Sequence, residues 1–186
     1  GQDTQVVIID ADGSKEQPSG STNVNTSAVV NIDLISDDTG VSTNDFITND
    51  NTLVYKGSVT GFTANGDQVK LELLAADGAT VLATTYVAPT ITSGTNATWS
   101  WDRSAITPTQ ADGKYTLRAT VVDSAGNRVN AAAAGQDTQV LIIDTSGSAN
   151  QPNTTPDGNA SNASVTIASI SDDTGTSVVD FITQDN

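Results

Sequence analysis

Gln68-Val-Lys-Leu-Glu-Leu-Leu74 is the stretch that most clearly decides the fold. Apolar and polar residues alternate along it with the two-residue period of a β-strand. The alternation predicts which side chains point inward and which outward: Val69, Leu71 and Leu73 inside, Lys70 and Glu72 outside. Asp77-Gly78 follows, and Asp-Gly between two strand signals is typical of a hairpin.

Further strand signals lie on both sides of this stretch, and no segment has a convincing helical pattern. They cover Ala28 to Ile35, Thr52 to Val59, Thr80 to Val87, Ala97 to Trp101, Lys114 to Val122 and Gln139 to Ile143. With the first stretch they make seven strands separated by turn signals. The pattern predicts an all-β fold, a seven-stranded immunoglobulin-like β-sandwich. Tyr115, just after the Asp112-Gly113 turn, lies where such folds carry a tyrosine corner.

Composition excludes several classes of function. The 186 residues carry a net charge of −15 with only seven Lys and Arg, so the chain is expected to repel nucleic acid and anionic membranes. There is no cysteine for disulfides and no histidine, the commonest general base. No apolar run is long enough to span a membrane. We therefore expect a protein that is not an enzyme.

The chain repeats itself. Gly1–Asp10 returns as Gly135–Asp144 with one change, which gives a repeat of about 134 residues. The repeat predicts a tandem array of domains, with neighbouring repeats as partners. Its expected parts are the last strand of a preceding repeat (1–10), a linker (11–26), a complete repeat (27–144), a second linker (145–162) and the start of the next repeat (163–186). The chain is therefore expected to be part of a longer protein.

The loop after the first predicted strand is rich in carboxylates. Ile35-Ser-Asp-Asp-Thr-Gly40 and Asp45-Phe-Ile-Thr-Asn-Asp-Asn51 return almost unchanged at 170–175 and 180–186. In a sandwich this loop lies at the pole where the last strand ends. The topology therefore predicts a set of acidic side chains at that pole: Asp37, Asp38, Asp45 and Asp50 with Asp112 and Asp144.

Calcium is the cation that such a loop would suit. It takes six to eight oxygens in irregular geometry, whereas zinc favours nitrogen and sulfur ligands that are missing here. The candidates extend to the duplicated Asp172, Asp173 and Asp180, and to Asp10, which recurs as Asp144. The alternative is that these are ordinary solvated turn aspartates, the interpretation that we keep for Asp77 and Asp102.

The order of these motifs resembles that of bacterial immunoglobulin-like repeats in giant surface adhesins. The motifs are the Asp-Asp-Thr-Gly loop, Asp112-Gly-Lys-Tyr115, Val122-Asp-Ser-Ala-Gly-Asn127 and Ile142-Ile-Asp144. That family includes the biofilm-associated proteins and the RTX and other type I-secreted adhesins. The resemblance implies a secreted, cell-surface extender that calcium stiffens near domain junctions, and it adds Asp123 to the candidate ligands.

A second function remains open at this point, a ligand- or glycan-binding adhesin module. Trp99 and Trp101 would be its candidates, because aromatic faces stack on sugars. Core packing is the competing role for both, because aromatic side chains contribute mostly through burial. An enzyme that uses two carboxylates is the remotest alternative, since no nucleophile and base are paired in the sequence.

Overall fold

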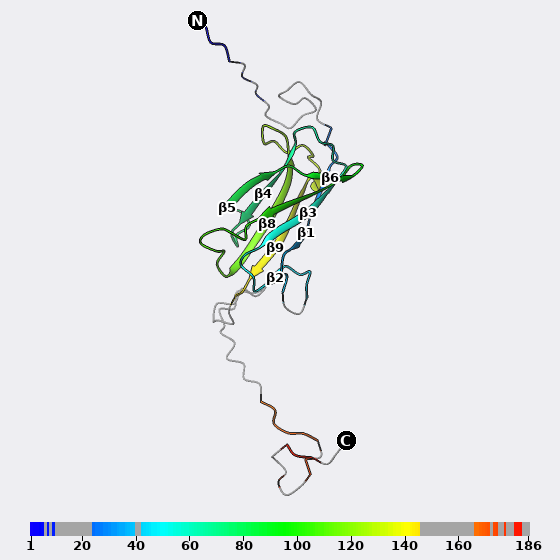
Figure 1. Cartoon of the computed structure of the whole chain (residues 1–186), viewed down its shortest axis with the longest axis vertical. Helices are drawn as coiled ribbons and strands as arrows, with labels where there is room; N and C mark the ends of the chain where they lie inside the picture. Colours follow the sequence, from blue (N-terminus) through cyan, green and yellow to red (C-terminus); the bar gives the residue numbers. More distant parts are fainter. Residues whose placement is uncertain are drawn as a thin grey trace.

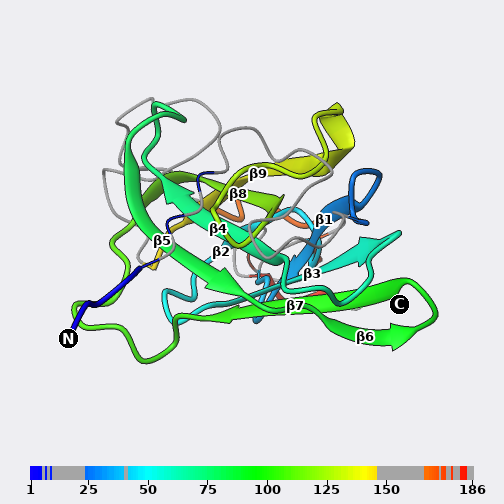
Figure 2. The same ribbon diagram turned by 90° about the horizontal axis from the view of Figure 1, so that it is seen from above.

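The chain folds into two β-sheets packed face to face (Figures 1 and 2). This computed structural model describes residues 1–5, 7, 9, 24–39, 42–145, 166–171, 173–174, 177 and 181–183. The first sheet has the order β1 (Val29–Ile35), β3 (Val54–Thr60), β7 (Asn96–Asp102), β6 (Thr90–Ser93). The second has the order β2 (Ile47–Thr48), β9 (Gln136–Ile143), β8 (Gly113–Val122), β4 (Gln68–Leu74), β5 (Val81–Val87).

The all-β sandwich is confirmed, but the strand count differs. Each of the seven expected strands overlaps an observed one, and the described residues add β2 and β6 to make nine. β2 has only two residues and β6 is exposed along its whole length, so neither carries an alternation of buried and exposed positions. The helical content of the described part is one 3₁₀ turn, Ala133–Gly135, and no helix there is long and apolar enough to cross a membrane.

Strand directions define two poles of the sandwich. β1 is antiparallel to β3, β9 is antiparallel to β8, and each of the two ends beside the start of its neighbour. β1 and β9 therefore run toward the same end of the sandwich, which we call the C-terminal pole. The loop 36–53, the connection 103–112 and residues 144–145 meet at this pole. The turn regions 61–67 and 123–135 lie at the opposite pole. The chain therefore enters the sandwich at one pole and leaves it at the other.

The core lies between the sheets and consists of the inward positions of both. Val69, Leu71 and Leu73 are at most 1% exposed, as their alternation predicted. The same holds for the inward side of the other strands: Val30, Tyr55, Val59, Leu117, Ala119, Val121, Leu141 and Ile143 are at most 1% exposed. Burial of this apolar surface is the main source of stability.

Tyr115 forms the tyrosine corner that its position predicted. Its hydroxyl donates a hydrogen bond of 2.8 Å to the carbonyl of Ala111, four residues upstream. Burial, followed by the charge of Asp112, raises the pKa of Tyr115, so the hydroxyl stays a donor at neutral pH. The bond fixes the connection 103–112 against the start of β8.

Glu72 does not lie in solvent as the alternation predicted. It is on the outward face of β4 but only 6% exposed, because Lys70 and Arg118 cover it. Its carboxylate lies 2.8 Å from Lys70 Nζ and 2.9 Å from Arg118 Nη2. Cross-strand neighbours on β4 and β8 can cover a side chain on an outer face, which the period of a single strand cannot show.

Gly57 makes room for Trp99. The two residues face each other across β3 and β7, and the indole lies where a side chain at position 57 would be. A Cβ there would be 2.2 Å from the Trp99 ring and 2.1 Å from the carbonyl oxygen of Asn31. Glycine is therefore required by close packing.

We predict that Gly57→Ala destabilises the sandwich by about 1–3 kcal/mol, because the added methyl group overpacks the core. Urea unfolding followed by tryptophan fluorescence measures the change. Gly113→Ala is the matched control, since the nearest contacts of its Cβ would be with the Tyr115 side chain at 3.4 Å. Equal stability of Gly57→Ala and the wild type would contradict the packing argument.

We also predict a pH-dependent contribution from Glu72. Burial alone would raise its pKa, but hydrogen bonds and charges from Arg118 and Lys70 outweigh burial and lower it below 4.5. A carboxyl with a lowered folded-state pKa stabilises the fold above its unfolded pKa, and this stabilisation is lost as pH falls. Glu72→Gln should cost on the order of 1 kcal/mol at pH 7 and progressively less below pH ~4.5. Urea unfolding at pH 7 and again below pH ~4.5 measures this difference. A cost of Glu72→Gln that does not change with pH would exclude the ion pairs as its source.

Candidate functional site

The carboxylate loop is joined to the last strand at the C-terminal pole. β2, inside this loop, runs parallel to the end of β9, with Ile47 beside Ile142 and Thr48 beside Ile143. Two backbone hydrogen bonds of 2.9 Å hold the pair, from Ile142 N to the Phe46 carbonyl and from Asp144 N to the Thr48 carbonyl. The loop therefore lies beside the point where the chain leaves the sandwich, as the topology predicted.

Phe46 turns the loop sharply and fills the core beneath it. Its φ of 62° is in the left-handed region, which is unusual for a bulky residue. The side chain is 6% exposed, while its amide donates a 3.0 Å hydrogen bond to Asp38 Oδ2. Contacts on both sides of the backbone hold it in this conformation. One oxygen of Asp38 thus has a structural role.

Thr48 organises the loop, and the sequence analysis did not single it out. It is 2% exposed, its hydroxyl donates to the Asp37 carbonyl at 2.6 Å, and the same oxygen accepts from Asp50 N at 3.0 Å. The hydroxyl also lies 3.2 Å from that of Thr39. Both threonines recur in the duplicated loop, as Thr174 and Thr183, and this recurrence is the signal that could have identified them.

Three carboxylates at this pole each have a buried oxygen that has no hydrogen-bond partner among the described residues. These atoms are Asp38 Oδ1, Asp50 Oδ2 and Asp144 Oδ1. The other oxygen of Asp50 accepts from the Thr52 amide at 2.8 Å and hydroxyl at 2.6 Å. All three residues are tied to the segment 46–50 by the hydrogen bonds above. A buried polar atom without a partner costs free energy, so each of these oxygens calls for an explanation.

The remaining candidates at this pole are more exposed. The side chains of Asp37 and Asp45 are exposed, and Asp45 Oδ1 accepts from Ile47 N at 3.1 Å. Asp112 Oδ1 accepts from both the amide and the hydroxyl of Thr145, at 3.0 and 2.7 Å. Asp112 thus fixes the chain just beyond β9. As they stand, no three acidic side chains in the described part form a group that could hold a metal ion.

Asp123 lies at the opposite pole, in the turn region 123–135. It is 2% exposed, and Oδ1 accepts from the amides of Ala125 and Asn127, both at 2.9 Å. These bonds give Asp123 a role in shaping its own turn. The exposed Asp77 also serves its own turn, where the Thr80 hydroxyl and then the Ala79 amide lower its pKa to about 2.

The second copy of the loop repeats the contacts of the first. Phe181 has a φ of 60°, and its amide donates to Asp173 Oδ2 at 3.2 Å, as Phe46 does to Asp38. The hydroxyls of Thr174 and Thr183 lie 3.4 Å apart. Asp173 Oδ1 is again buried without a partner in the described part of the chain, as Asp38 Oδ1 is. The candidates Asp10, Asp172 and Asp180 lie outside the described residues.

The tryptophans belong mainly to the core. Trp99 is 4% exposed and Trp101 is half-buried, and the two lie on the same face of β7. The guanidinium of Arg103 lies 4.9 Å from the centre of the Trp101 ring, and the Tyr55 ring packs beside it at 5.6 Å. Neither indole therefore presents an open face on which a sugar could stack.

Comparison with known proteins assigns the family. A family model described as "Bacterial Ig-like domain" matches residues 23–145, which is more than half of the chain. The chain therefore belongs to the bacterial Ig-like domain family, a family of surface-type domains that is typically non-enzymatic.

More distant comparisons add little. No curated protein is significantly similar to the chain. Among solved structures, the CARDB domain of a Pyrococcus furiosus protein, in complex with di-metal ions, shares 18% sequence identity. The match covers 63% of this chain and 87% of that domain, with a TM-score of 0.36.

We predict that the buried hydroxyl of Thr48 is needed for the fold of the pole. Thr48→Val keeps the shape but leaves the Asp37 carbonyl and the Asp50 amide without this partner, which should cost about 1–3 kcal/mol. Thr48→Ser keeps the hydroxyl and should cost less. Urea unfolding of both variants measures the difference. If valine were tolerated as well as serine, the hydroxyl would not organise the loop.

Proposed function

We propose that this domain is a structural extender of a bacterial cell-surface adhesin, and that calcium bound at the C-terminal pole makes it rigid. The observation that carries the proposal is the set of unpartnered buried oxygens on Asp38, Asp50 and Asp144. Asp38 and Asp50 lie before and after β2 in the loop, and Asp144 directly follows β9. A cation that they share would therefore join the loop to the segment where the chain leaves the sandwich.

Calcium suits these residues better than other cations. All three offer carboxylate oxygen, the ligand that calcium prefers, and the chain has no histidine or cysteine for zinc. The loop 36–53 has no basic residue of its own to balance its aspartates. A divalent cation would relieve their mutual repulsion, and each unpartnered oxygen could serve as one of its ligands. Binding would draw the carboxylates closer together than they now lie.

An extender must transmit orientation from one domain to the next, and several features of the poles support this role. The chain enters at one pole, where Asn25 is fully buried and its amide bonds to Thr63 and Asp67. It leaves at the other pole, where Asp112 binds the backbone and hydroxyl of Thr145. Both ends of the domain are therefore fixed by hydrogen bonds to its own turns.

The end segments support a tandem array. Val7 and Ile9 are 79% and 87% exposed, while the matching Leu141 and Ile143 of β9 are fully buried. Near the other end, Ile167 is 74% exposed, whereas the matching Ile32 is 8% exposed. These apolar side chains correspond to core positions of neighbouring repeats, which would be this domain's main partners.

The family and the motif order support the wider biological role. Surface-type bacterial Ig-like domains with the Asp-Asp-Thr-Gly loop and the Asp-Ser-Ala-Gly-Asn turn resemble the repeats of type I-secreted and biofilm-associated adhesins. In that role the domain would be secreted to the cell surface and would hold a terminal adhesive domain away from it. Adhesion and biofilm formation would depend on its length and stiffness rather than on chemistry.

We predict that calcium raises the melting temperature and that Asp144→Asn removes much of this effect. At a calcium concentration 100 times the dissociation constant, linkage gives about 2.7 kcal/mol, a shift of at least ~5 °C for a domain of this size. Differential scanning calorimetry with calcium or excess EGTA measures the shift, and isothermal titration counts the sites. Asp77→Asn is the control of equal charge, because Asp77 binds only its own turn.

Rigidity needs a separate measurement. Small-angle scattering of the chain should give a larger, better-defined maximum dimension with calcium than with EGTA. The proposal fails if no heat of binding is found and both the melting temperature and the scattering curve stay unchanged. Binding without any change in scattering would retain the site but reject its stiffening role.

A further inference from the structure

β5 is an open edge of the second sheet. β4 pairs with one side of this strand, and no described strand pairs with the other side. Figures 1 and 2 show β5 at the margin of the sandwich. An open edge presents a row of unpaired backbone N–H and C=O groups, to which a further strand can add. Proteins commonly protect such an edge with charged side chains, above all lysine.

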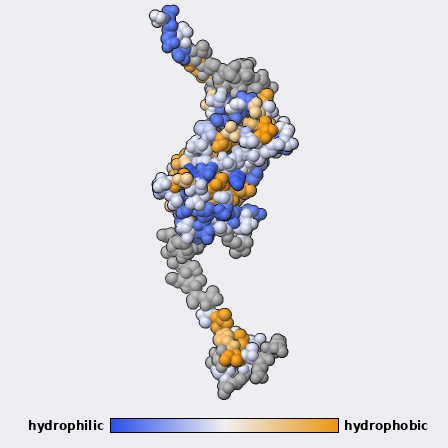
Figure 3. Space-filling view, in the orientation of Figure 1, coloured by the Kyte–Doolittle hydropathy of each residue, from blue (hydrophilic) through white to orange (hydrophobic). Residues whose placement is uncertain are grey.

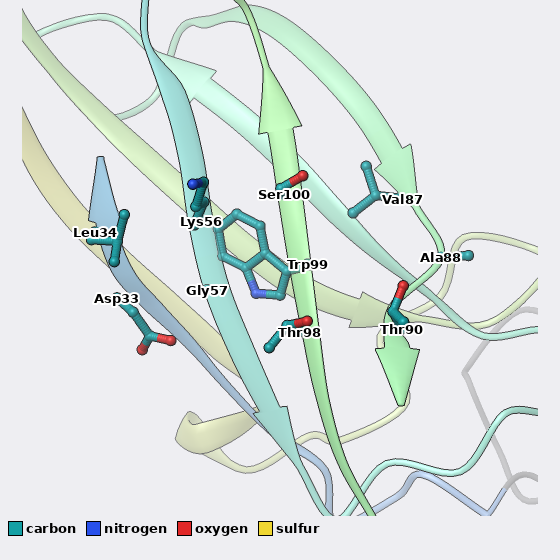
Figure 4. A pocket seen from close by; sticks show the side chains of 10 residues that line it. All are labelled: Asp33, Leu34, Lys56, Gly57, Val87, Ala88, Thr90, Thr98, Trp99 and Ser100. Carbon is teal, nitrogen blue, oxygen red and sulfur yellow. The ribbon is translucent and has the colours of Figure 1, made fainter. Parts of the chain in front are cut away.

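This edge lies in the longest uncharged run of the chain. No Lys, Arg, Asp or Glu occurs between Asp77 and Asp102, although the net charge of the chain is −15. The run contains β5 and β6, which are edges of the two sheets. Figure 4 shows Val87, Ala88 and Thr90 along the passage from one edge strand to the other. Neither of these two edge strands is therefore protected by a charge of its own.

The side chains of β5 are poorly covered on both faces of the sheet. Val81, Leu82 and Tyr86 are 45%, 52% and 48% exposed. Ala83 and Val87 pack against the core but are only half-buried, because the sheet ends at this strand. Figure 3 shows hydrophobic surface over the region that Figure 1 labels β5. An added strand would cover apolar side chains on both faces as well as pair with the backbone.

A bulge sets the length of the edge that can pair. The register between β4 and β5 shifts between Leu73 and Leu74, which leaves Leu82 as an extra residue on β5. A bulge bends a strand and interrupts its ladder. Residues 83–87 keep an unbroken register with β4, so this part of the edge is regular and ready to accept a strand.

We propose that β5 pairs antiparallel with β5 of a second copy of this chain, so that the two second sheets become one. The same edge supplies both halves of such a contact, which has two-fold symmetry. With Thr85 on the axis, Thr84 lies opposite Tyr86 of the second copy, and Ala83 lies opposite Val87 of the second copy. Pairs of an aromatic with a β-branched residue stabilise antiparallel strands.

Charge favours a second copy over other partners. Two copies repel each other through most of their surfaces, because each has a net charge of −15, and this repulsion is weakest where charged side chains are missing. A basic partner would be drawn to the carboxylates at the poles rather than to an uncharged edge. The second copy also brings an edge of equal length with the same unpaired backbone groups.

The contact is weak by itself and gains from repetition. A pair of short strands buries less than the ~1,200 Å² at which stable interfaces begin. Equivalent edges in two parallel tandem arrays would act together, and their combined affinity would far exceed that of one pair. This use, the lateral association of neighbouring surface proteins, rests on the proposed extender function, whereas the dimer of single domains does not.

The first test is the oligomeric state of the whole chain. Sedimentation equilibrium at protein concentrations from about 10 μM to 1 mM covers the range in which a weak dimer forms. We expect a reversible dimer whose fraction rises with protein concentration. Raising the ionic strength from about 0.05 M to 0.5 M should increase that fraction, because salt screens the repulsion between two like-charged copies.

A matched pair of double variants locates the contact. Leu82→Glu with Tyr86→Glu should weaken dimerisation at least about tenfold, because carboxylates of the two copies would then lie diagonally across the axis. Leu34→Glu with Val140→Glu makes the same charge change at residues that are 45% and 42% exposed on β1 and β9, and should leave the dimer unchanged. Circular dichroism confirms that both double variants fold.

A single cysteine tests the register without disturbing the edge. The chain has no cysteine, so an introduced thiol can form a disulfide only with another copy. Directly opposite Cα atoms in antiparallel strands are about 4.5–5.5 Å apart, which a disulfide can span. Thr85→Cys should therefore form linked dimers in air faster than Thr138→Cys on β9, although Thr138 is the more exposed of the two.

The proposal is overturned if the chain stays monomeric up to about 1 mM at both ionic strengths, or if both double variants dimerise as the wild type does. It is also overturned if Val7→Asp with Ile9→Asp abolishes the dimer, because the exposed end segment would then be the strand that adds to the edge. A monomer that binds calcium would reject the edge contact and retain the proposed extender function. A dimer that binds no calcium would retain the edge contact and reject the calcium site.

Discussion

The backbone pairing of β2 with the end of β9 is the contact on which the organisation of the C-terminal pole depends. Two hydrogen bonds join the carbonyls of Phe46 and Thr48 to the backbone amides of Ile142 and Asp144, where the chain leaves the sandwich. Through them an eighteen-residue excursion between β1 and β3 becomes part of the second sheet. Without this pair, no backbone hydrogen bond would join the loop that carries Asp38 and Asp50 to the end of β9 beside Asp144.

The two ends of the domain differ in how they satisfy buried side-chain oxygens. At the opposite pole, Asn25 and Asp123 are buried with their oxygens bonded to nearby turns. At the C-terminal pole, three carboxylate oxygens remain without partners among the described residues. A folded domain does not retain such atoms without a cost, which is why the proposed cation belongs to this pole.

Much of the fold could be predicted because it depends on short-range pattern. The alternation in β4 placed its core side chains correctly, and the turn before Tyr115 identified its corner bond. The prediction for Glu72 was wrong because burial on an outer face depends on neighbours from another strand, here Arg118. β2 escaped prediction because two residues carry no period; its partner, β9, lies more than ninety residues away in sequence. The importance of the acidic loop could be predicted from its duplication, and its position at the C-terminal pole from the topology. The role of Thr48 could not, because the sequence does not show which hydroxyl is buried.

Two duplicated segments separate what the sequence determines from what tertiary structure decides. The loop at 173–183 has the same Asp–Phe hydrogen bond and the same positive φ as its copy at 38–48, so these features are set by local residues. By contrast, Gly1–Asp10 and Gly135–Asp144 are nearly identical, yet the described residues of the first contain no strand and the second contains β9. β9 has β8 and β2 beside it to accept its hydrogen bonds and cover Leu141 and Ile143, while Val7 and Ile9 are exposed. A turn closed by its own side chains needs only its sequence, but a strand exists only where a partner pairs with its backbone.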